Sequence, residues 1–262
     1  MLKIPTGIFG LDELISGGFV KNTVNAVLGT VGCGKTIFSL QYLLQGIEDN
    51  QEAVYISFDL EVKDFLRIAR SMGWKLEEKI SDGLLKVGRF QVEDSFIDSE
   101  LVKFITGKDM RIVIDSFTPL VASLETSRAR NEVNWLYKTL RESGTALITV
   151  EEPFFGTAGK EVDVPLILAD CVIQLKNVGY GEAYSRTLRV IKHRMSPHLN
   201  SVFPYSILEG VGLVVEEKRC EGFEVDLSDL PLSESTKEKL YRYCKDGILK
   251  PEEIQKIRRR LI

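Results

Sequence analysis

The chain has little of the chemistry that binds metals through nitrogen and sulfur. Its 262 residues include two histidines and four cysteines, and no two cysteines form a C-x-x-C pair. A zinc site is therefore not expected. Isolated cysteines in this number are typical of reduced thiols in a cytoplasmic protein. The cysteines are Cys33, Cys171, Cys220 and Cys244.

Long apolar runs are also missing. No run approaches the roughly 20 residues that span a bilayer, and residues 1–10 lack the basic and apolar parts of a signal peptide. We therefore expect a cytoplasmic location without insertion into a membrane.

The chain has no excess of positive charge. Its 34 Lys and Arg residues stand against 38 Asp and Glu residues, which gives a formal net charge of -4. A strongly basic surface that binds a phosphate backbone is not expected from this total, although local basic patches remain possible. Hydrophobic residues at 44% and charged residues at 27% are typical of a folded globular protein.

Short apolar runs alternate with helical patterns over the first two thirds of the chain. This order predicts an α/β fold with a mostly parallel central sheet and helices on both faces. Beyond about residue 180, apolar runs are joined by loops instead of helices, which predicts antiparallel strands at one sheet edge. The predicted strands are 24–28, 53–58, 111–115, 146–150, 171–175, 185–194 and 212–216, and the predicted helices are 36–44, 62–72 and 131–142.

The end of the chain is charged and polar, and it predicts a small helical hairpin at 224–262 after a core domain of residues 1–223. Ser235 with Glu238 resembles a capping box at the start of one helix. Pro251 suits the first turn of the second. One face of that second helix carries Ile254, Ile257 and Leu261.

The segment from Gly29 to Thr36 fits the pattern G-x-x-x-x-G-K-[ST] of a phosphate-binding loop. Its glycines let backbone N–H groups point at phosphate oxygens, and the following helix adds its positive end. Lys35 would reach the outer phosphates, and the Thr36 hydroxyl would bind Mg²⁺. The candidate nucleotide-binding residues are Gly29, Thr30, Val31, Gly32, Cys33, Gly34, Lys35, Thr36 and Ile37.

Two further residues belong to this hypothesis. The apolar run 112–114 ends in Asp115, and an acid at the end of a neighbouring strand reaches the Mg²⁺ in such folds, usually through water. Cys33 lies inside the loop. Either its alkylation blocks nucleotide, or its side chain is a small filler.

Several segments, taken in order, resemble the KaiC-like branch of the RecA superfamily of ATPases. T-G-I-F-G-L-D-E-L-I-S-G-G at 6–18, A-R-S-M-G-W at 69–74 and K-H-R-M-S-P-H at 192–198 are similar to segments of that family. The resemblance covers roughly residues 4–217. It implies a RecA-like P-loop NTPase core that binds ATP and Mg²⁺. It also implies a ring-shaped, hexameric homo-oligomer with ATP between neighbouring subunits.

The resemblance also implies a catalytic acid. Family members usually carry two adjacent glutamates just after the second strand, and the first is taken to activate the attacking water. Here the place is occupied by Asp59 and Leu60, and Glu61 falls one position late. Asp59 is shorter by one methylene, and proton abstraction depends on hydrogen-bond reach. The resemblance thus implies an ATPase whose hydrolysis rate depends on how well Asp59 replaces a glutamate.

The late segment supplies candidate cations. In KaiC-like rings this segment reaches the triphosphate held by the adjacent subunit, which implies such a role for Lys192, Arg194 and His198. By strand period, Lys192 and Arg194 project to the same side, and Leu188 and Val190 share that face. The alternative is two solvated cations on an edge strand.

Three functions stay open. The first is an ATPase ring whose nucleotide state regulates a protein partner in signalling or assembly. The second is a RecA/RadA-paralogue-like accessory ATPase that binds DNA in recombination or repair. The third is an ATP-binding scaffold with negligible hydrolysis. The segment 240–262 resembles hairpins of the SHOCT type, which implies an interaction or assembly element.

Two features bear on DNA. Within residues 151–163, Phe154 and Phe155 could stack on bases, but four acids against Lys160 alone give a sum of -3, the wrong sign for a phosphate backbone. The basic run of Lys256 and residues 258–260 could touch an anionic partner, or it could be the solvated face of the last helix. DNA binding is possible and not favoured.

Overall fold

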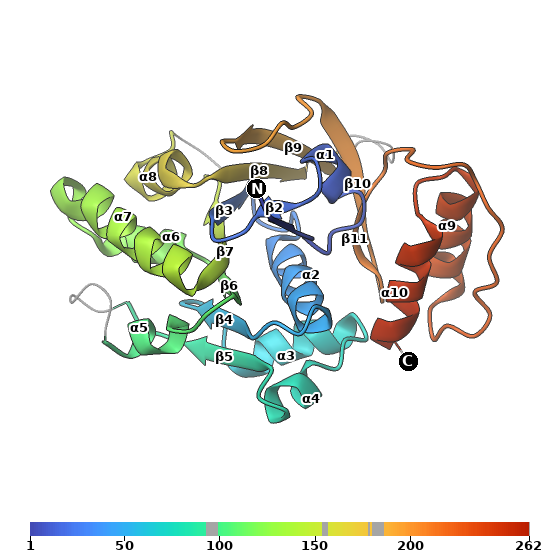
Figure 1. The fold of residues 1–262 in the computed structure, drawn as a ribbon, viewed down its shortest axis with the longest axis horizontal. Helices are drawn as coiled ribbons and strands as arrows, with labels where there is room; N and C mark the ends of the chain where they lie inside the picture. Colours follow the sequence, from blue (N-terminus) through green and yellow to red (C-terminus); the bar gives the residue numbers. More distant parts are fainter. Residues whose placement is uncertain (93–98, 154–156, 178, 180–185, 262) are drawn as a thin grey trace.

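The computed structural model describes residues 1–92, 99–153, 157–177, 179 and 186–261, and it contains a nine-stranded sheet in the order β11-β10-β9-β8-β3-β7-β6-β4-β5 (Figure 1). The run from β8 to β5 is parallel, and β9, β10 and β11 are antiparallel additions at one edge. The expected α/β fold with a mostly parallel sheet is confirmed. The strands are β3 (Val24–Gly29), β4 (Ala53–Ser57), β5 (Leu85–Arg89), β6 (Met110–Ile114), β7 (Gly144–Glu151), β8 (Cys171–Asn177), β9 (Arg186–His193), β10 (Val202–Leu208) and β11 (Gly212–Val215).

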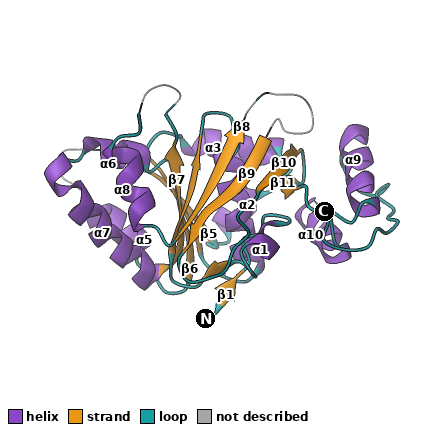
Figure 2. Cartoon of the chain, turned by 90° about the horizontal axis from the view of Figure 1, so that it is seen from above, coloured by secondary structure: helices purple, strands orange, loops and turns teal. Residues whose placement is uncertain are grey.

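Helices cover both faces of this sheet (Figure 2). One face packs against α1 to α4, and the other packs against α5 to α8. Among the described residues, no helix is long and apolar enough to cross a membrane. The helices are α1 (Leu11–Leu14), α2 (Lys35–Glu48), α3 (Val62–Ser71), α4 (Leu76–Ser81), α5 (Ser99–Ile105), α6 (Thr118–Ser123), α7 (Thr126–Ser143), α8 (Lys160–Leu168), α9 (Glu234–Lys245) and α10 (Pro251–Leu261), and a two-stranded ribbon joins β1 (Lys3–Ile4) to β2 (Phe19–Val20).

Burial on both faces explains the composition of the central strands. Every residue of β3, β4 and β6 is buried, so these strands are nearly continuous apolar runs without an alternation of polar residues. The helix α7 buries Val133, Leu136, Tyr137 and Leu140 on the side that faces the sheet, as its sequence pattern predicts. The chain therefore has one extensive core on each side of the sheet.

The C-terminal helices pack against the antiparallel edge. Leu240 and Tyr243 of α9 and Ile257 of α10 form a third apolar cluster with Leu208 of β10 and Val214 of β11. In Figure 1 the two helices stand side by side at the end of the molecule beyond β10 and β11. The predicted helical hairpin is present, and it is packed onto the edge of the sheet.

The predicted start of α9 is wrong by two residues. Its N-cap is Ser233, whose hydroxyl oxygen accepts a hydrogen bond of 3.3 Å from the backbone N–H of Thr236. Because Thr236 is buried and its N–H is bonded to Ser233, the helix begins directly after Ser233. Ser235 therefore lies inside the first turn, where it cannot cap.

Two of the elements that the sequence-based prediction omits contain a proline. Strand β10 carries Pro204, which cannot donate to a sheet ladder, and helix α8 carries Pro165, which lacks a helical N–H. The surrounding packing overrides both local preferences. The predicted strands and helices are present with ends within a few residues, apart from Ser185, which lies outside the described residues.

The buried side chain of Arg111 supports a first prediction. Its guanidinium donates to the Pro5 carbonyl at 2.7 Å and to the Gln51 side chain at 2.6 Å, and it pairs with Asp49 at 3.1 Å. Arg111→Ala should lower the free energy of unfolding by about 3 kcal/mol or more, because it removes a fully buried side chain that packs over the Tyr42 ring and leaves a cavity. Urea unfolding measures this change.

The matched control is Arg128→Ala, whose ion pair with Glu125 leaves both side chains 75% exposed. Removal of this surface pair should change the free energy of unfolding by less than about 0.5 kcal/mol. Equal losses in the two variants would contradict the role assigned to Arg111.

Candidate nucleotide-binding site

The loop between β3 and α2 has the backbone of a phosphate cradle. Gly32 and Gly34 have φ angles of 77° and 97°, in the left-handed region that favours glycine. Gly34 is also confined by packing, because a Cβ there would lie 2.4 Å from Cδ1 of Ile207. Helix α2 begins at Lys35, directly after Gly34. The positive end of α2 therefore opens onto the loop.

The ammonium group of Lys35 lies across this loop. Its Nζ donates to the carbonyl oxygens of Gly29 at 2.8 Å and of Thr30 at 3.1 Å. These are neutral acceptors, and a phosphate oxygen is a stronger, charged one. The structure thus holds Lys35 where an incoming triphosphate would compete for its ammonium group.

A pocket of about 490 Å³ lies over the loop. Thr36 and Ile37 line it from the start of α2, and Asp59 and Asp115 line it from the ends of β4 and β6. Parallel strands bring their carboxyl ends to one sheet edge, so residues far apart in sequence meet there. The volume suits a small-molecule ligand.

Asp115 is held by two hydroxyl groups. Tyr55 donates to Oδ2 at 2.9 Å, and Thr149 donates to Oδ1 at 2.6 Å, while the carboxylate is almost fully buried. These bonds fix the direction of the side chain and leave acceptor capacity on each oxygen. Carboxylate and hydroxyl oxygens are the ligands that Mg²⁺ prefers. Asp115 and Thr36 together therefore fit a magnesium site.

Asp59 and Glu61 have different surroundings. Asp59 lines the pocket, and partial burial together with the charge of Asp115 raises its pKa, whereas Arg89 acts in the opposite direction. A raised pKa makes a carboxylate a better proton acceptor. Glu61 precedes α3 and pairs with Arg89 at 2.6 Å. Of these two acids, Asp59 is the one that faces the pocket.

Cys33 is fully buried beneath the loop. Burial raises the pKa of its thiol, and the nearby Lys35 lowers it by less. A Cβ on Gly29 would lie 2.5 Å from the Cys33 sulfur, so the thiol fills space against the start of the loop. This geometry favours the small-filler alternative over a reactive cysteine.

Lys192 and Arg194 lie at the other end of the sheet. Strand β9 is antiparallel to β8 and ends beside its start, away from the carboxyl ends that carry the loop. Both cations donate to the carbonyl oxygen of Ile167, at 3.0 Å from Lys192 and 2.5 Å from Arg194. They do project to one side, where the negative end of α8 receives them. Within one chain they do not line the pocket.

The prediction that Lys192 shares a sheet face with Leu188 and Val190 is wrong. The pairing of β8 with β9 shifts so that Ile173 pairs with Val190 and Val172 pairs with Lys192. This bulge leaves Ile191 as the extra residue, 44% exposed, and turns Lys192 away from the buried face of Val190. His198 is half-buried in the loop that follows, and none of the described residues bonds to its Nε2.

Residues 4–219 match the family described as "ATPase: KaiC". This chain belongs to the KaiC family. It is 31% identical over 224 residues to the circadian clock protein KaiC2 of Synechocystis sp., covering 80% of this chain and 39% of that protein. It is 33% identical over 227 residues to the circadian clock oscillator protein KaiC of Prochlorococcus marinus, covering 80% of this chain and 45% of that protein. It therefore spans less than half the length of these two relatives.

A solved structure agrees with the fold. The KaiC-like protein PH0186 from Pyrococcus horikoshii has a TM-score of 0.68 and 27% sequence identity to this chain, covering 82% of this chain and 99% of that one. The RecA-type core is thus shared, and the chain has the fold of a KaiC-type ATPase.

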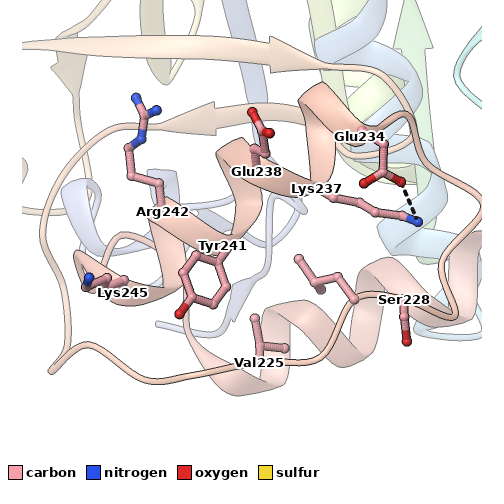
Figure 3. Close-up of a pocket in the computed structure, with 9 residues that line it drawn as sticks. Val225, Ser228, Glu234, Lys237, Glu238, Tyr241, Arg242 and Lys245 are labelled. Atoms are coloured by element: carbon pink, nitrogen blue, oxygen red, sulfur yellow. Dashed lines mark hydrogen bonds and ion pairs between the residues drawn. The ribbon is translucent and has the colours of Figure 1, made fainter.

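This KaiC-type chain has a second, larger hollow of about 670 Å³ on the outer side of α9 (Figure 3). Lys237 and Arg242 line it together with Glu234 and Glu238, and Glu234 pairs with Lys237 at 3.2 Å. Charges of both signs surround it, and its lining residues include no glycine that could form a phosphate loop. Its chemistry does not match a triphosphate, so the smaller pocket is the nucleotide candidate.

Several residues of the candidate site are missing from the sequence-based prediction. Glu151 and Ser57 line the pocket from strand ends, and Ile207 lines it from β10. Tyr55 and Thr149 orient Asp115 from within buried strands. Polar residues in otherwise apolar strands are a signal that could have identified Tyr55 and Thr149. Ile207 carries no such signal.

Removal of the Lys35 ammonium tests the pocket directly. Lys35→Ala should lower the affinity for Mg·ATP by at least about a hundredfold, because bonds to a charged donor are among the strongest that a ligand loses. Calorimetric titration measures this affinity. Lys63→Ala, on the exposed surface of α3, is the control and should bind normally. Normal binding by both variants would contradict the assignment of residues 29–36 as the nucleotide site.

Proposed function

We propose that this KaiC-family chain binds Mg·ATP at residues 29–36 and hydrolyses it. We propose further that it acts as a hexameric ring whose nucleotide state regulates a protein partner. The observation that carries the proposal is the meeting of Lys35, Thr36, Asp59 and Asp115 in one pocket at the carboxyl end of the sheet. A cytoplasmic location, in keeping with four unpaired thiols, is part of it.

Each residue has a distinct task in the proposed reaction. The loop N–H groups and Lys35 hold the outer phosphates, and Thr36 and Asp115 hold Mg²⁺. The metal, when bound, offsets negative charge on the phosphates. Asp59, which lines the same pocket, orients a water and accepts its proton. Tyr55 and Thr149 keep Asp115 pointed at the pocket.

The ring requires a subunit interface, and the surface around β9 supports one. Large apolar side chains are exposed there, from 38% for Met195 to 55% for Val202, and such patches are typical of protein contacts. Lys192 and Arg194 emerge beside them. We infer that these cations, with His198, reach the triphosphate of the adjacent subunit and stabilise charge on the transferred phosphoryl group. The other exposed apolar residues of this surface are Ile167, Ile191 and Leu199.

A DNA-binding role gains little from the basic C-terminal run. Lys256 donates to Gln45, Arg258 pairs with Asp229, and Arg260 is buried against Glu48. Three of the four cations therefore serve contacts within the chain and are not free for a phosphate backbone.

Some of the acidic residues in segment 151–163 also have structural roles within the chain. Glu161 and Asp163 lie in the first turn of α8, where negative charge suits the helix end. Glu152 accepts a hydrogen bond of 2.9 Å from Gln174. Phe154, Phe155 and Gly156 lie outside the described residues. We therefore keep the protein-regulating ring as the proposal.

Asp59→Asn separates binding from hydrolysis. The variant should bind Mg·ATP nearly as wild type, because the amide keeps the shape of the side chain. It should lose hydrolysis by about 10²–10⁴-fold, because the amide cannot accept a proton. Steady-state phosphate release measures the rate. Glu61→Gln, at the acid paired with Arg89, is the control and should keep the rate within about twofold. A rate lost in Glu61→Gln and kept in Asp59→Asn would reverse the assignment.

A subunit-mixing experiment tests the shared site. Arg194→Ala should bind ATP yet lose hydrolysis, and Lys35→Ala should fail to bind. A mixture of the two should regain turnover, because one variant keeps the loop and the other keeps the cation. Light scattering with gel filtration should show assembly promoted by Mg·ATP. A monomer with and without nucleotide would refute the shared site. If wild-type rings assemble but do not turn over ATP, the scaffold hypothesis replaces the ATPase.

A further inference from the structure

Strand β10 touches the phosphate loop with one face and the C-terminal hairpin with the other. Side chains alternate along a strand, and here Tyr205 and Ile207 face the loop while Ser206 and Leu208 face the hairpin. The strand thus stands between the candidate nucleotide site and two helices that take no direct part in it.

The contacts on the loop side are direct. The Tyr205 hydroxyl donates to the backbone carbonyl of Cys33, inside the loop. Burial raises the pKa of Tyr205, so the phenol remains a neutral donor. Ile207 lines the pocket and lies against Gly34, where a Cβ would meet it at 2.4 Å. A shift of β10 would therefore move the loop backbone at Cys33 and Gly34.

The contacts on the hairpin side form one network. Lys239 of α9 donates to the Ser206 hydroxyl at 2.7 Å, and Ser206 donates to Glu216. Tyr243 of α9 also donates to Glu216. The backbone N–H of Glu216 donates to the Pro204 carbonyl of β10 at 2.8 Å. Helix α9 therefore holds β10 through polar bonds as well as through the apolar cluster around Leu208.

A second connection reaches the phosphate loop through α2. Gln41, buried in α2, accepts a hydrogen bond of 2.8 Å from the N–H of Leu213 in β11 and donates to the Leu213 carbonyl at 3.3 Å. Arg260 of α10 pairs with Glu48 at the end of α2 at 2.6 Å. Because α2 begins at Lys35, the hairpin contacts both the helix that follows the loop and the strand that supports it.

We propose that the C-terminal hairpin and the phosphate loop are energetically coupled through β10, with Tyr205 as a positioning residue for the loop and Tyr243, through Glu216, as one of the residues by which the hairpin holds β10. A ligand at the loop then stabilises the hairpin, and a change in the hairpin alters nucleotide affinity by the same factor, because such coupling is reciprocal. This inference rests on the proposed nucleotide site. It adds a route by which nucleotide state can be communicated to a protein bound at the hairpin.

Three tyrosine variants measure the coupling. Tyr205→Phe and Tyr243→Phe each remove one hydroxyl at either end of the network, and each should weaken Mg·ADP binding by about threefold to tenfold in calorimetry. The control is Tyr241→Phe on the same helix, 42% exposed on the side of the outer hollow (Figure 3). It should bind Mg·ADP as wild type. If Tyr205→Phe and Tyr243→Phe bind Mg·ADP as tightly as Tyr241→Phe and the wild type, the proposal is overturned.

Hydrogen exchange on the wild-type chain gives a second readout. Saturating Mg·ADP should slow amide exchange at 29–38 and, through β10, at 234–245 in α9. In Tyr205→Phe the protection of 29–38 should persist while that of α9 falls. Protection at 29–38 with unchanged exchange in α9 of the wild type would overturn the coupling and leave the nucleotide site intact. No protection at 29–38 would overturn the nucleotide site and the coupling together.

Discussion

The parallel pairing of β3 between β7 and β8 is the constraint on which the candidate site depends. Val24 to Gly29 pair along their whole length with β7, and Asn25 to Gly29 pair with β8. The carboxyl end of β3 is therefore held in place, and the chain must turn within a few residues into α2. Because β4 and β6 run in the same direction, they deliver Asp59 and Asp115 to the same edge. Of these two acids Asp115 is the buried one, and hydroxyls from Tyr55 and Thr149 orient it.

The same topology places the two groups of candidate residues at opposite ends of the sheet. The phosphate loop lies at the carboxyl edge of the parallel strands, and Lys192 and Arg194 lie at the opposite edge because β9 runs the other way. In a single chain these cations bind the Ile167 carbonyl. A ring in which one subunit offers its loop and the next offers its cations would use both edges at once, which gives a physical reason for ATP to govern assembly in this proposal.

Much of the fold could be predicted from sequence because the decisive signals are local. Strands buried on both faces, such as β3 and β6, are recognisable as apolar runs, and the loop is recognisable from glycines at a fixed spacing from Lys35. What could not be predicted depends on tertiary packing. Pro204 and Pro165 lie inside a strand and a helix that neighbouring elements stabilise. The bulge at Ile191 changes the face of Lys192, and no local pattern marks it. The contact of Ile207 with Gly34 joins residues that are far apart in the sequence.

The central claim is that a triphosphate occupies the loop between β3 and α2. A crystal structure of the chain with Mg²⁺ and a non-hydrolysable ATP analogue tests it most directly. We expect the outer phosphates to lie within residues 29–36, Mg²⁺ to lie about 2.1 Å from the Thr36 hydroxyl oxygen, and the Lys35 ammonium to have left the Gly29 and Thr30 carbonyls for a phosphate oxygen. Nucleotide bound only in the hollow beside α9, with the loop and Lys35 unchanged, would contradict it.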